Sequence, residues 1–333
     1  MNPQVAVVGA GAWGRNHVRT LHAMGALGGV VETSPALREG IRADFPGSPV
    51  WGSLEEALPH VPGFVIATPA GSHVALATTA LRAGKGVLVE KPMALEVDGA
   101  EALVQAASDA ERMLMVGHLL LYQPAIQKLK AFLEAGLIGR IHRIHQERLN
   151  FGRVRDTENV LWSLGPHDVA VLLFLMGEAP LEVAAAGASF LQPGIHDDVH
   201  LELAFSAGRS AHVHNSWYWP EQRRCLRVFG ETGMIVYDER EQSLVLQRKQ
   251  VARALPGQEP GREGLALVDD GTTTLFQGHG QPLQLEDEHF LHCLASGERP
   301  LSDGESGLDV IRVLARADAQ LNHSNHFLEK ELS

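Results

Sequence analysis

Two short runs of this 333-residue sequence have residue types and spacing that suit chemistry on a nucleotide cofactor. The first is the apolar run 5–8, followed by Gly9-Ala10-Gly11-Ala12-Trp13-Gly14. A strand, a glycine turn and the start of a helix form the geometry that holds a dinucleotide pyrophosphate. The second is the apolar run 87–89, followed by Glu90-Lys91-Pro92, which puts a lysine at the carboxyl end of another parallel strand. Together the two runs predict a nicotinamide enzyme with Lys91 beside the reacting carbon.

The glycines and a later acid specify the cofactor. Gly9 permits the tight turn, Gly11 lets the backbone approach the phosphates, and Gly14 lets the helix pack against the strand. Eighteen residues past Gly14 an apolar stretch ends in Glu32, where an acid would bind both ribose hydroxyls and repel a 2′-phosphate. An ordinary glycine turn with an unrelated surface acid is the alternative. Because strand, glycines, helix and acid are in register, we expect NAD rather than NADP, with Ala12 and Trp13 among its contacts.

Other polar residues follow strand signals in the same part of the chain. The apolar run 64–67 ends in Thr68-Pro69, and the run 113–116 is followed by His118. Active sites in doubly wound sheets lie at the carboxyl ends of the strands. We therefore expect Thr68, Pro69, Glu90 and His118 to lie beside the cofactor with Lys91.

Length and composition exclude several classes of protein. A chain of 333 residues favours two domains, and 45% hydrophobic residues can build a large core. The formal net charge of −12 argues against nucleic acid as a partner. Two cysteines are too few for a disulfide framework or a cysteine metal site. Since no apolar run reaches the length of a membrane span and the N-terminus lacks a basic, apolar signal, we expect a cytoplasmic protein with no membrane partner.

The order of strand and helix signals predicts an α/β protein of two domains. Residues 1–123 alternate between the two signals, which predicts a Rossmann domain with helices over 13–24, 35–44, 53–58, 72–83 and 96–111. Residues 124–333 begin with a helix over 125–135 and contain another over 163–176. Their strand-like runs, joined by short turns, predict a C-terminal α+β domain with a large, open, mostly antiparallel sheet. The runs are 141–148, 183–190, 199–205, 210–217, 225–229, 234–237 and 244–247.

The end of the chain completes this layout. Residues 252–264, rich in Pro and Gly, predict a surface loop. Helices are expected over 285–295 and 307–321, the second packing back on the Rossmann domain. The broad sheet needs cover on its second face, which predicts sheet-to-sheet packing in a homodimer or homotetramer.

The sequence resembles the Gfo/Idh/MocA oxidoreductases along nearly the whole chain. The matching stretches are G-A-G-A-W-G, A-T-P-A-G-S-H ending at His73, A-G-K-G-V-L-V-E-K-P ending at Pro92, and G-P-H-D at residues 165–168. The resemblance implies a nicotinamide-binding Rossmann domain, an open-sheet second domain and redox chemistry on sugar or inositol carbons. It also implies that His73 lies near the cofactor. The family commonly has an aspartate four residues before the histidine of the last stretch, but here the residue is Ser163.

Three stretches resemble one subgroup of that family more narrowly. They are residues 117–125, 148–155 and 158–168. The subgroup comprises 3-dehydrogenases of UDP-N-acetylglucosamine and of its uronic acid form, from bacterial surface-polysaccharide pathways. The resemblance implies oxidation of a sugar 3-hydroxyl to a ketone. It implies substrate contacts from Tyr122, Trp162 and Ser163.

Lys91 and His167 are the candidate catalytic residues. Oxidising a secondary alcohol requires a hydride acceptor, a proton acceptor and a group that stabilises the developing alkoxide. Lys91 can bind the hydroxyl and stabilise negative charge. His167, at the start of the helix expected over 163–176, is the better general base because histidine titrates near neutrality. A surface lysine before a proline and a buried helix-start histidine are the alternatives.

Arg148, Asn150, Arg153 and Arg155 alternate along a strand and its exit, so they are expected to face one side. Guanidinium groups match diphosphate or carboxylate oxygens, which favours substrate contact. A solvated edge strand is the alternative.

Two more groups of residues leave their roles open. His212 and His214 share a strand face, but no third ligand stands at metal-like spacing, so no metal is expected. The aromatic run 217–219 suits a sugar site or a subunit interface.

Three functions therefore compete. The first is the nucleotide-sugar 3-dehydrogenase, and the second is a dehydrogenase of a free sugar or inositol. The third is a non-catalytic cofactor-binding regulator, against which the presence of Lys91 and His167 counts.

Overall fold

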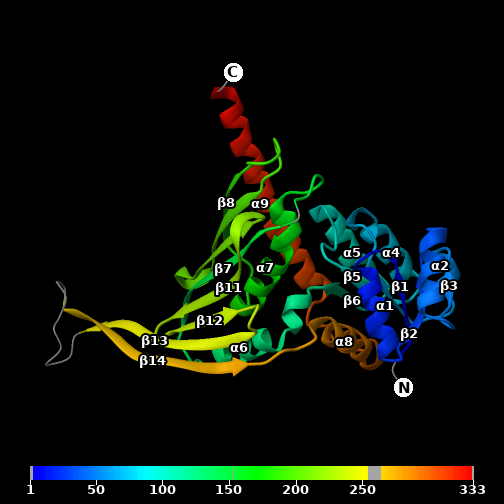
Figure 1. Cartoon of the computed structure of the whole chain (residues 1–333), viewed down its shortest axis with the longest axis horizontal. Helices are drawn as coiled ribbons and strands as arrows, with labels where there is room; N and C mark the ends of the chain where they lie inside the picture. Colours follow the sequence, from blue (N-terminus) through cyan, green and yellow to red (C-terminus); the bar gives the residue numbers. More distant parts are fainter. Residues whose placement is uncertain (1–2, 153, 254–263, 332–333) are drawn as a thin grey trace. The chain divides into compact units, whose positions relative to one another are not determined.

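The computed structural model describes residues 3–152, 154–253 and 264–331. The chain forms two compact units (Figure 1). The first contains residues 1–123 and 281–315, and the second contains residues 124–280 and 316–333. The expected second domain ran without interruption to the C-terminus, whereas residues 281–315 belong to the first unit.

The first unit contains a parallel sheet of six strands. Its order is β3-β2-β1-β4-β5-β6, which is the Rossmann order. The direction in which strands are added reverses between β1 and β4, and ligands of such sheets bind at the carboxyl ends beside that point. The strands are β1 (Val5–Val8), β2 (Leu27–Val31), β3 (Val50–Trp51), β4 (Gly63–Ile66), β5 (Gly86–Glu90) and β6 (Leu114–Gly117).

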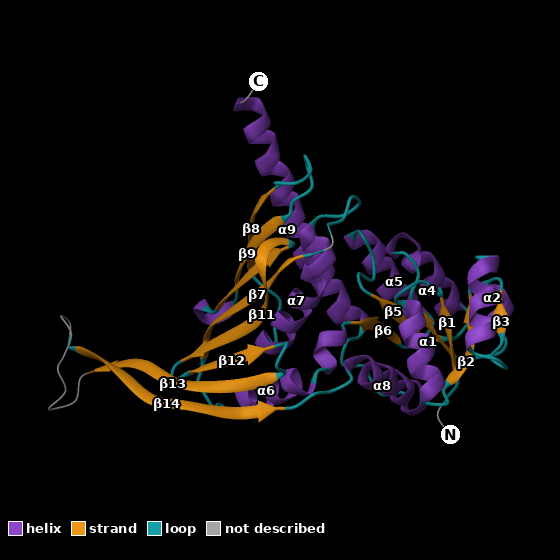
Figure 2. Ribbon diagram, viewed as in Figure 1, coloured by secondary structure: helices purple, strands orange, loops and turns teal. Residues whose placement is uncertain are grey.

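Helices flank this sheet (Figure 2). Ser34 and Ser53 cap two of them by accepting hydrogen bonds from the amides of Leu37 and Glu56. The helices are α1 (Gly14–Ala23), α2 (Pro35–Asp44), α3 (Leu54–Ala57), α4 (His73–Arg82), α5 (Val97–Asp109) and α8 (Pro282–Ser296), with short 3₁₀ turns η1 (Ala70–Ser72) and η2 (Leu119–Tyr122). Helix α8 packs against α1 and η2, which explains why residues from near the C-terminus belong to this unit.

The second unit contains a sheet of eight strands, ordered β14-β13-β12-β11-β7-β10-β9-β8. Neighbours are antiparallel except β7 and β10, so the expected mostly antiparallel sheet is confirmed. Its strands are β7 (Ile141–Phe151), β8 (Glu182–Ala188), β9 (Asp198–Ala204), β10 (Ser210–Ser216), β11 (Tyr218–Gly230), β12 (Met234–Asp238), β13 (Ser243–Arg253) and β14 (Leu265–Gln277).

Helices α6 (Pro124–Glu134) and α7 (Val160–Met176) accompany this sheet, and the long helix α9 (Gly304–Glu331) runs from the first unit into the second. Helix α7 packs on β7, β9 and β10. Asp168 of α7 accepts hydrogen bonds from Gln146 and Arg148, so these side chains point to the helix. Because side chains alternate along a strand, His145 and Glu147 lie on the opposite face.

Several expected elements differ from the structure. Helix α7 begins at Val160 rather than at residue 163, because the Asn159 side chain caps it by accepting from the amide of Trp162 at 3.1 Å. Strand β14 was not expected at all. Its sequence is rich in Asp and Thr and lacks an apolar alternation, yet it pairs with β13 through the backbone. Of the surface loop expected at 252–264, residues 252–253 belong to β13 and residues 254–263 lie outside the described residues.

Among the described residues, no helix combines the length and the apolar character needed to cross a membrane.

Candidate active site

The glycine turn after β1 has the close contacts that a dinucleotide site requires. Gly9 has a φ of +94°, and a Cβ there would lie 2.8 Å from the carbonyl oxygen of Ala67. A Cβ on Gly14 would overlap the carbonyl oxygen of Gly9. At Gly11, by contrast, a Cβ would meet no atom within 4 Å. The turn is therefore tightly packed on its protein side and open at Gly11, where the backbone can approach a phosphate.

Glu32 lies at the carboxyl end of β2 and is held by backbone amides. Its Oε2 accepts from the amide of Ala10 at 2.8 Å and its Oε1 from the amide of Ser34 at 2.8 Å. Each carboxylate oxygen can accept a further hydrogen bond, which suits ribose hydroxyls. The guanidinium of Arg38 donates to the carbonyl oxygens of Glu32 and Thr33, both at 2.9 Å.

A cavity of about 590 Å³ joins these features at the carboxyl edge of the first sheet. Its walls come from the ends of β1, β2 and β4, and they include Ala12, Trp13, Glu32, Thr68 and Pro69. No side chain in the described part of the chain caps the N-terminus of α1, so its first amides can bind an anion. The open backbone at Gly11, the Glu32 carboxylate and this cavity fit a dinucleotide. A larger cavity, about 650 Å³, is lined by other residues, among them Gly86, Leu114 and Cys293.

His73 holds two strand ends together. Its ring nitrogens lie 2.7 Å from the carbonyl oxygen of Thr68 and 2.9 Å from that of Pro92, and its side chain is buried. The Thr68 hydroxyl accepts from the Ser72 hydroxyl at 2.7 Å. The contacts of His73 thus link the turns after β4 and β5, where Thr68 and Lys91 lie. We expected it at the cofactor, but its described contacts are to these backbone carbonyls.

Glu90 ends strand β5 and Lys91 follows it, as expected. The Glu90 carboxylate accepts from the Lys91 amide at 3.1 Å, from the Trp13 indole at 2.5 Å and from His17 at 2.8 Å. Burial alone would raise the pKa of Glu90, but hydrogen bonds from His17 and Trp13 and the charge of Lys91 hold it below its usual range. Glu90 is therefore a buried anion that connects the glycine turn to the strand end of Lys91.

His17, which the sequence reasoning missed, completes this arrangement. Its second ring nitrogen lies 2.8 Å from Asp287 of α8. Burial alone would lower the pKa of His17, but the Asp287 and Glu90 carboxylates raise it well above its usual range. A histidine three residues after Gly14 was the only signal in the sequence, and nothing pointed to Asp287, which is 270 residues away.

Two neighbouring groups have pKa values shifted toward their uncharged forms. Burial lowers the pKa of His118 to about 4, and the charge of Lys91 acts in the same direction. Burial also raises the pKa of Glu286 well above its usual range, with the Glu90 charge adding to the effect. Both side chains are buried. Burial therefore favours the uncharged forms of His118 and Glu286 close to the charged pair of His17 and Glu90.

Tyr122 has a different role from the expected substrate contact. Its side chain is 6% exposed, and its hydroxyl lies 2.9 Å from the Ser302 hydroxyl. Burial raises the pKa of Tyr122 far above its usual range. Because the hydroxyl is already paired inside the first unit, Tyr122 is a core residue and we withdraw it from the substrate site.

Helix α7 carries the expected general base. His167 lies in the second turn of the helix, not at its start, because the helix begins at Val160. Ser163 is four residues earlier and thus on the same helix face. Both side chains, and that of Trp162, are partly exposed. The next residue, Asp168, is fully buried and fastens this turn of the helix to the sheet.

Arg148 takes part in that anchor and does not line a site. Its Nε donates to Asp168 at 2.8 Å, and its two terminal nitrogens donate to Glu239 at 3.1 and 2.7 Å. Its side chain is only 7% exposed, and Asn215 also donates to Asp168 at 2.6 Å. The expected substrate contact is therefore corrected to a buried ion pair. The sequence did not reveal Glu239, which is 91 residues from Arg148.

The other three residues of the expected substrate strand differ in their surroundings. Asn150 is partly exposed at the end of β7, and Arg153 lies outside the described residues. Arg155 is exposed, 3.7 Å from Glu158, and its carbonyl oxygen accepts from Gln192 at 2.8 Å. Of the described arginines in this set, only Arg155 presents its guanidinium to solvent.

The aromatic run 217–219 divides between core and surface. Trp217 is buried and donates to Asp197 at 2.6 Å, whereas Tyr218 and Trp219 are 43% and 36% exposed. The Tyr218 ring lies 5.7 Å from that of Phe151 and 5.8 Å from that of Phe190. We call Phe151, Phe190 and Tyr218 the aromatic cluster.

Comparison with known proteins identifies the family. Residues 4–118 match an oxidoreductase family with an NAD-binding Rossmann fold, and residues 126–236 match the Gfo/Idh/MocA C-terminal domain. The chain belongs to the Gfo/Idh/MocA oxidoreductase family. It is an enzyme of the oxidoreductase class, and its cofactor is NAD.

Relatives of this family member are named for different substrates. The chain is 28% identical over 318 residues to a UDP-N-acetylglucosamine 3-dehydrogenase of Acidithiobacillus ferrooxidans, covering 94% of this chain and 95% of that protein. An inositol 2-dehydrogenase of Rhizobium meliloti is 25% identical over 334 residues, covering 96% of each chain.

Solved structures agree with the fold. That of the A. ferrooxidans enzyme superposes with a TM-score of 0.84 at 25% identity, covering 98% of this chain and 99% of the other. The structure of an oxidoreductase from Magnetospirillum magnetotacticum MS-1 superposes with a TM-score of 0.80 at 32% identity, covering 95% of this chain and 100% of the other.

Proposed function

We propose that this oxidoreductase uses NAD to oxidise the 3-hydroxyl of a UDP-linked N-acetylhexosamine, or of its uronic acid, to a 3-keto sugar for surface-polysaccharide biosynthesis. The observation that carries the proposal is the exposed aromatic cluster close to Arg155. Phe151 and Phe190 are 74% and 62% exposed, and the Arg155 backbone is bonded to Gln192, two residues beyond Phe190.

The two groups suit the two halves of a nucleotide. Aromatic rings offer faces on which a uracil base can stack, worth about 1–3 kcal/mol per base. A guanidinium matches phosphate or carboxylate oxygens with two parallel hydrogen bonds. Full-length similarity to a UDP-N-acetylglucosamine 3-dehydrogenase supports the same substrate class. A free polyol would need neither the base platform nor the arginine.

The proposed chemistry divides among three side chains. When bound, NAD supplies the hydride acceptor for alcohol oxidation. Lys91 hydrogen-bonds the substrate hydroxyl and stabilises the negative charge that develops on its oxygen. His167 accepts the hydroxyl proton. Ser163, where relatives of the family commonly have an acid, orients the substrate or the His167 ring without adding a charge.

The sequence also left two alternative functions open. Similarity to an inositol 2-dehydrogenase over 96% of each chain favours a free polyol as the second candidate. A non-catalytic regulator, the third function expected from the sequence, is not supported, because the chain belongs to an oxidoreductase family. Lys91 and His167 are both present, which a regulator would not require.

Calorimetry on NAD-loaded protein separates the first two candidates. The ligands are UDP-N-acetylglucosamine, its uronic acid, free N-acetylglucosamine and myo-inositol. We expect binding of at least one UDP-sugar and none of free N-acetylglucosamine or inositol at the same concentration. Because forming this ketone with NAD is uphill, turnover is measured with a keto-sugar aminotransferase to remove the product. Binding of inositol with no response to either UDP-sugar would assign the second function.

A further inference from the structure

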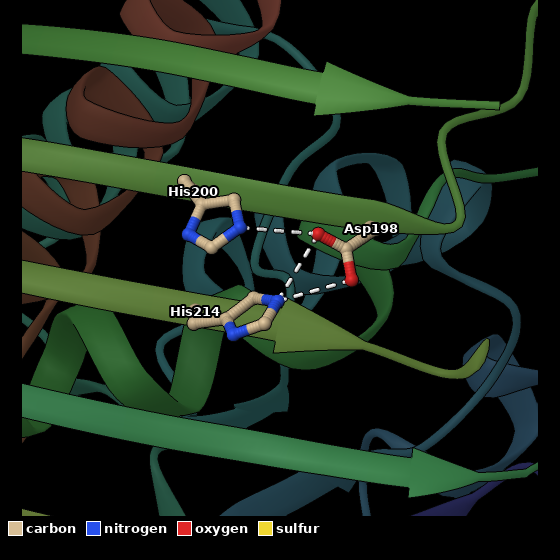
Figure 3. A group of neighbouring side chains, drawn as sticks. All are labelled: Asp198, His200 and His214. Carbon is tan, nitrogen blue, oxygen red and sulfur yellow. Dashed lines mark hydrogen bonds and ion pairs between the residues drawn. The ribbon is translucent and has the colours of Figure 1, made fainter. Parts of the chain in front are cut away.

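Three side chains converge on the face of the second sheet that α7 does not cover. The Nε2 atom of His214 lies 3.0 Å from both carboxylate oxygens of Asp198, and that of His200 lies 3.3 Å from Oδ1 (Figure 3). The two imidazole rings are stacked, with centroids 3.9 Å apart and planes 20° from parallel. We call Asp198, His200 and His214 the sheet triad.

Regular backbone pairing places the triad. Asp198 and His200 are two residues apart on β9, so their side chains share one face. On β10, His214 is paired directly with His200. Directly opposed residues of an antiparallel pair have Cβ atoms about 4.5–5.5 Å apart. The triad is therefore a triangle on two rigid strands, and no loop movement is needed to assemble it.

This triangle has the dimensions of a metal site. Zinc bonds of about 2.0–2.1 Å in tetrahedral geometry set neighbouring ligand atoms about 3.3 Å apart. The carboxylate–imidazole distances of 3.0 and 3.3 Å are close to that value, and the possible ligand atoms of the triad all lie within 4.8 Å of one another. Figure 3 shows both rings directing a nitrogen at the carboxylate. A small shift of the side chains would accommodate an ion.

The surroundings favour a cation and hold the ligands in place. Asp198 is 14% exposed, and its carboxylate faces both imidazoles. Trp219 packs its ring at 87° to that of His214, with centroids 5.3 Å apart, which restricts that imidazole. His200 is 46% exposed in the single chain.

We propose that the sheet triad binds one divalent transition-metal ion of the zinc type. Two imidazoles and one carboxylate suit zinc, cobalt or nickel, whereas magnesium prefers oxygen ligands only. Three protein ligands leave a fourth position for water or another donor. The neighbouring His212 is bonded to Glu202 at 2.9 Å and remains outside the triad.

The sequence alone argued against this site, because His212 and His214 had no third ligand nearby in the chain. The structure supplies Asp198 and His200 from the adjacent strand. A second group of possible ligands among the described residues, His17, Glu90 and Glu286, is fully buried. There both ring nitrogens of His17 are bonded to carboxylates, and none of the three residues is exposed to solvent, so that group does not compete as an ion site.

Metal binding is tested with zinc and cobalt salts on the full chain without an affinity tag. The protein is first stripped of metal with a chelator, then incubated with zinc or cobalt and dialysed to remove unbound ions. We expect elemental analysis to find one zinc ion per chain. Bound cobalt should give the intense visible absorption of a tetrahedral site. Excess magnesium should displace neither ion. The variants are Asp198→Asn and His214→Gln, each expected to weaken zinc binding by ten-fold or more.

His212→Gln, on the same face, and His60→Gln, in the other unit, are the matched controls and should bind as the wild type does. The melting temperature and circular dichroism of each metal-free variant show whether it folds. His200→Gln provides a third ligand change, at a more exposed position, should either of the first two variants fail to fold. Equal zinc binding by wild type and folded triad variants, or no zinc retained by the wild type, would overturn the proposal.

Discussion

His17 and Glu90 form a charged contact inside the first unit, with Nε2 of His17 2.8 Å from Oε1 of Glu90. Both side chains are buried, and Asp287 flanks the imidazole on its other side at 2.8 Å. The contact links α1, which follows the glycine turn, to the end of β5 that carries Lys91. It therefore joins the cofactor turn to the candidate catalytic strand end.

Removing this imidazolium should destabilise the protein. His17→Asn leaves two buried carboxylates without their cation, a change that typically costs about 3–5 kcal/mol. Thermal unfolding at pH 6 should show a large drop in melting temperature. His22→Asn, an exposed histidine of the same helix, is the control and should unfold as the wild type does. An unchanged melting temperature in His17→Asn would contradict the buried charge assignment.

The same residue gives stability a pH dependence of known sign. The pKa of His17 is raised on folding, so its stabilisation is complete below the unfolded value of about 6.5 and is lost as pH rises through the folded value. The difference in melting temperature between wild type and His17→Asn should be largest near pH 6 and should shrink toward alkaline pH. A difference that grows between pH 7 and 9 would mean that the imidazole is neutral.

Cofactor choice should depend on Glu32. Its carboxylate is held by the amides of Ala10 and Ser34, where it can bind ribose hydroxyls but would repel a 2′-phosphate. We expect NADH to bind more tightly than NADPH. Glu32→Ser should reduce the ratio of NADH affinity to NADPH affinity by about ten-fold or more, which is the usual effect of one hydrogen bond to a charged group. Fluorescence titration measures both cofactors, with Glu39→Ser as an exposed control; tighter NADPH binding by the wild type would refute the assignment.

The catalytic assignment separates turnover from cofactor binding. Lys91→Ala should lower turnover by about two orders of magnitude or more, because it removes an acid–base or oxyanion partner. NADH affinity should change by only a few-fold. His167→Ala should lower turnover by a similar factor and flatten the pH–rate profile near neutrality. Lys128 is an exposed lysine of α6, and Lys128→Ala is the control that should turn over as the wild type does. A near-normal rate for Lys91→Ala would show that the catalytic site lies elsewhere.

Substitution of Arg148 should lower stability, whereas substitution of Arg155 should weaken substrate binding. Arg148→Ala strands Asp168 and Glu239 without their cation, so it should lower the free energy of unfolding by about 3–5 kcal/mol. Arg155→Ala should leave the melting temperature unchanged but weaken UDP-sugar binding about ten-fold, with NADH affinity spared. Denaturant unfolding and calorimetry measure the two effects. Loss of substrate affinity in a folded Arg148→Ala protein at wild-type stability would restore Arg148 to the substrate site.

Assembly can be checked directly. The face of the second sheet opposite α7 has no helix among the elements that contact β7, β9 and β10 in the described chain. A partner sheet is the expected cover, giving a homodimer or homotetramer. Light scattering at micromolar concentration should report a mass at least twice that of the 36.0 kDa chain. A monomer would show that this face is stable in water.

The sequence alone predicted the site residues that lie in continuous motifs. The glycine turn, Glu32 after β2 and Lys91 after β5 follow from strand periodicity and from the backbone freedom that Gly9 requires. The two-domain α/β layout followed from the change from alternating strand and helix signals to successive strands. These features depend on neighbours in sequence, so one chain is enough to predict them.

Tertiary structure decided the features that depend on pairing between distant residues. Arg148 left the expected substrate set because Glu239, 91 positions away, binds its guanidinium. The register of β9 against β10 brought Asp198 and His200 to His214. His17 became charged because Asp287 of α8 reaches it. Burial makes each of these partnerships strong, since a charge removed from water must find a partner, and which partner is near is determined by folding and not by spacing along the chain.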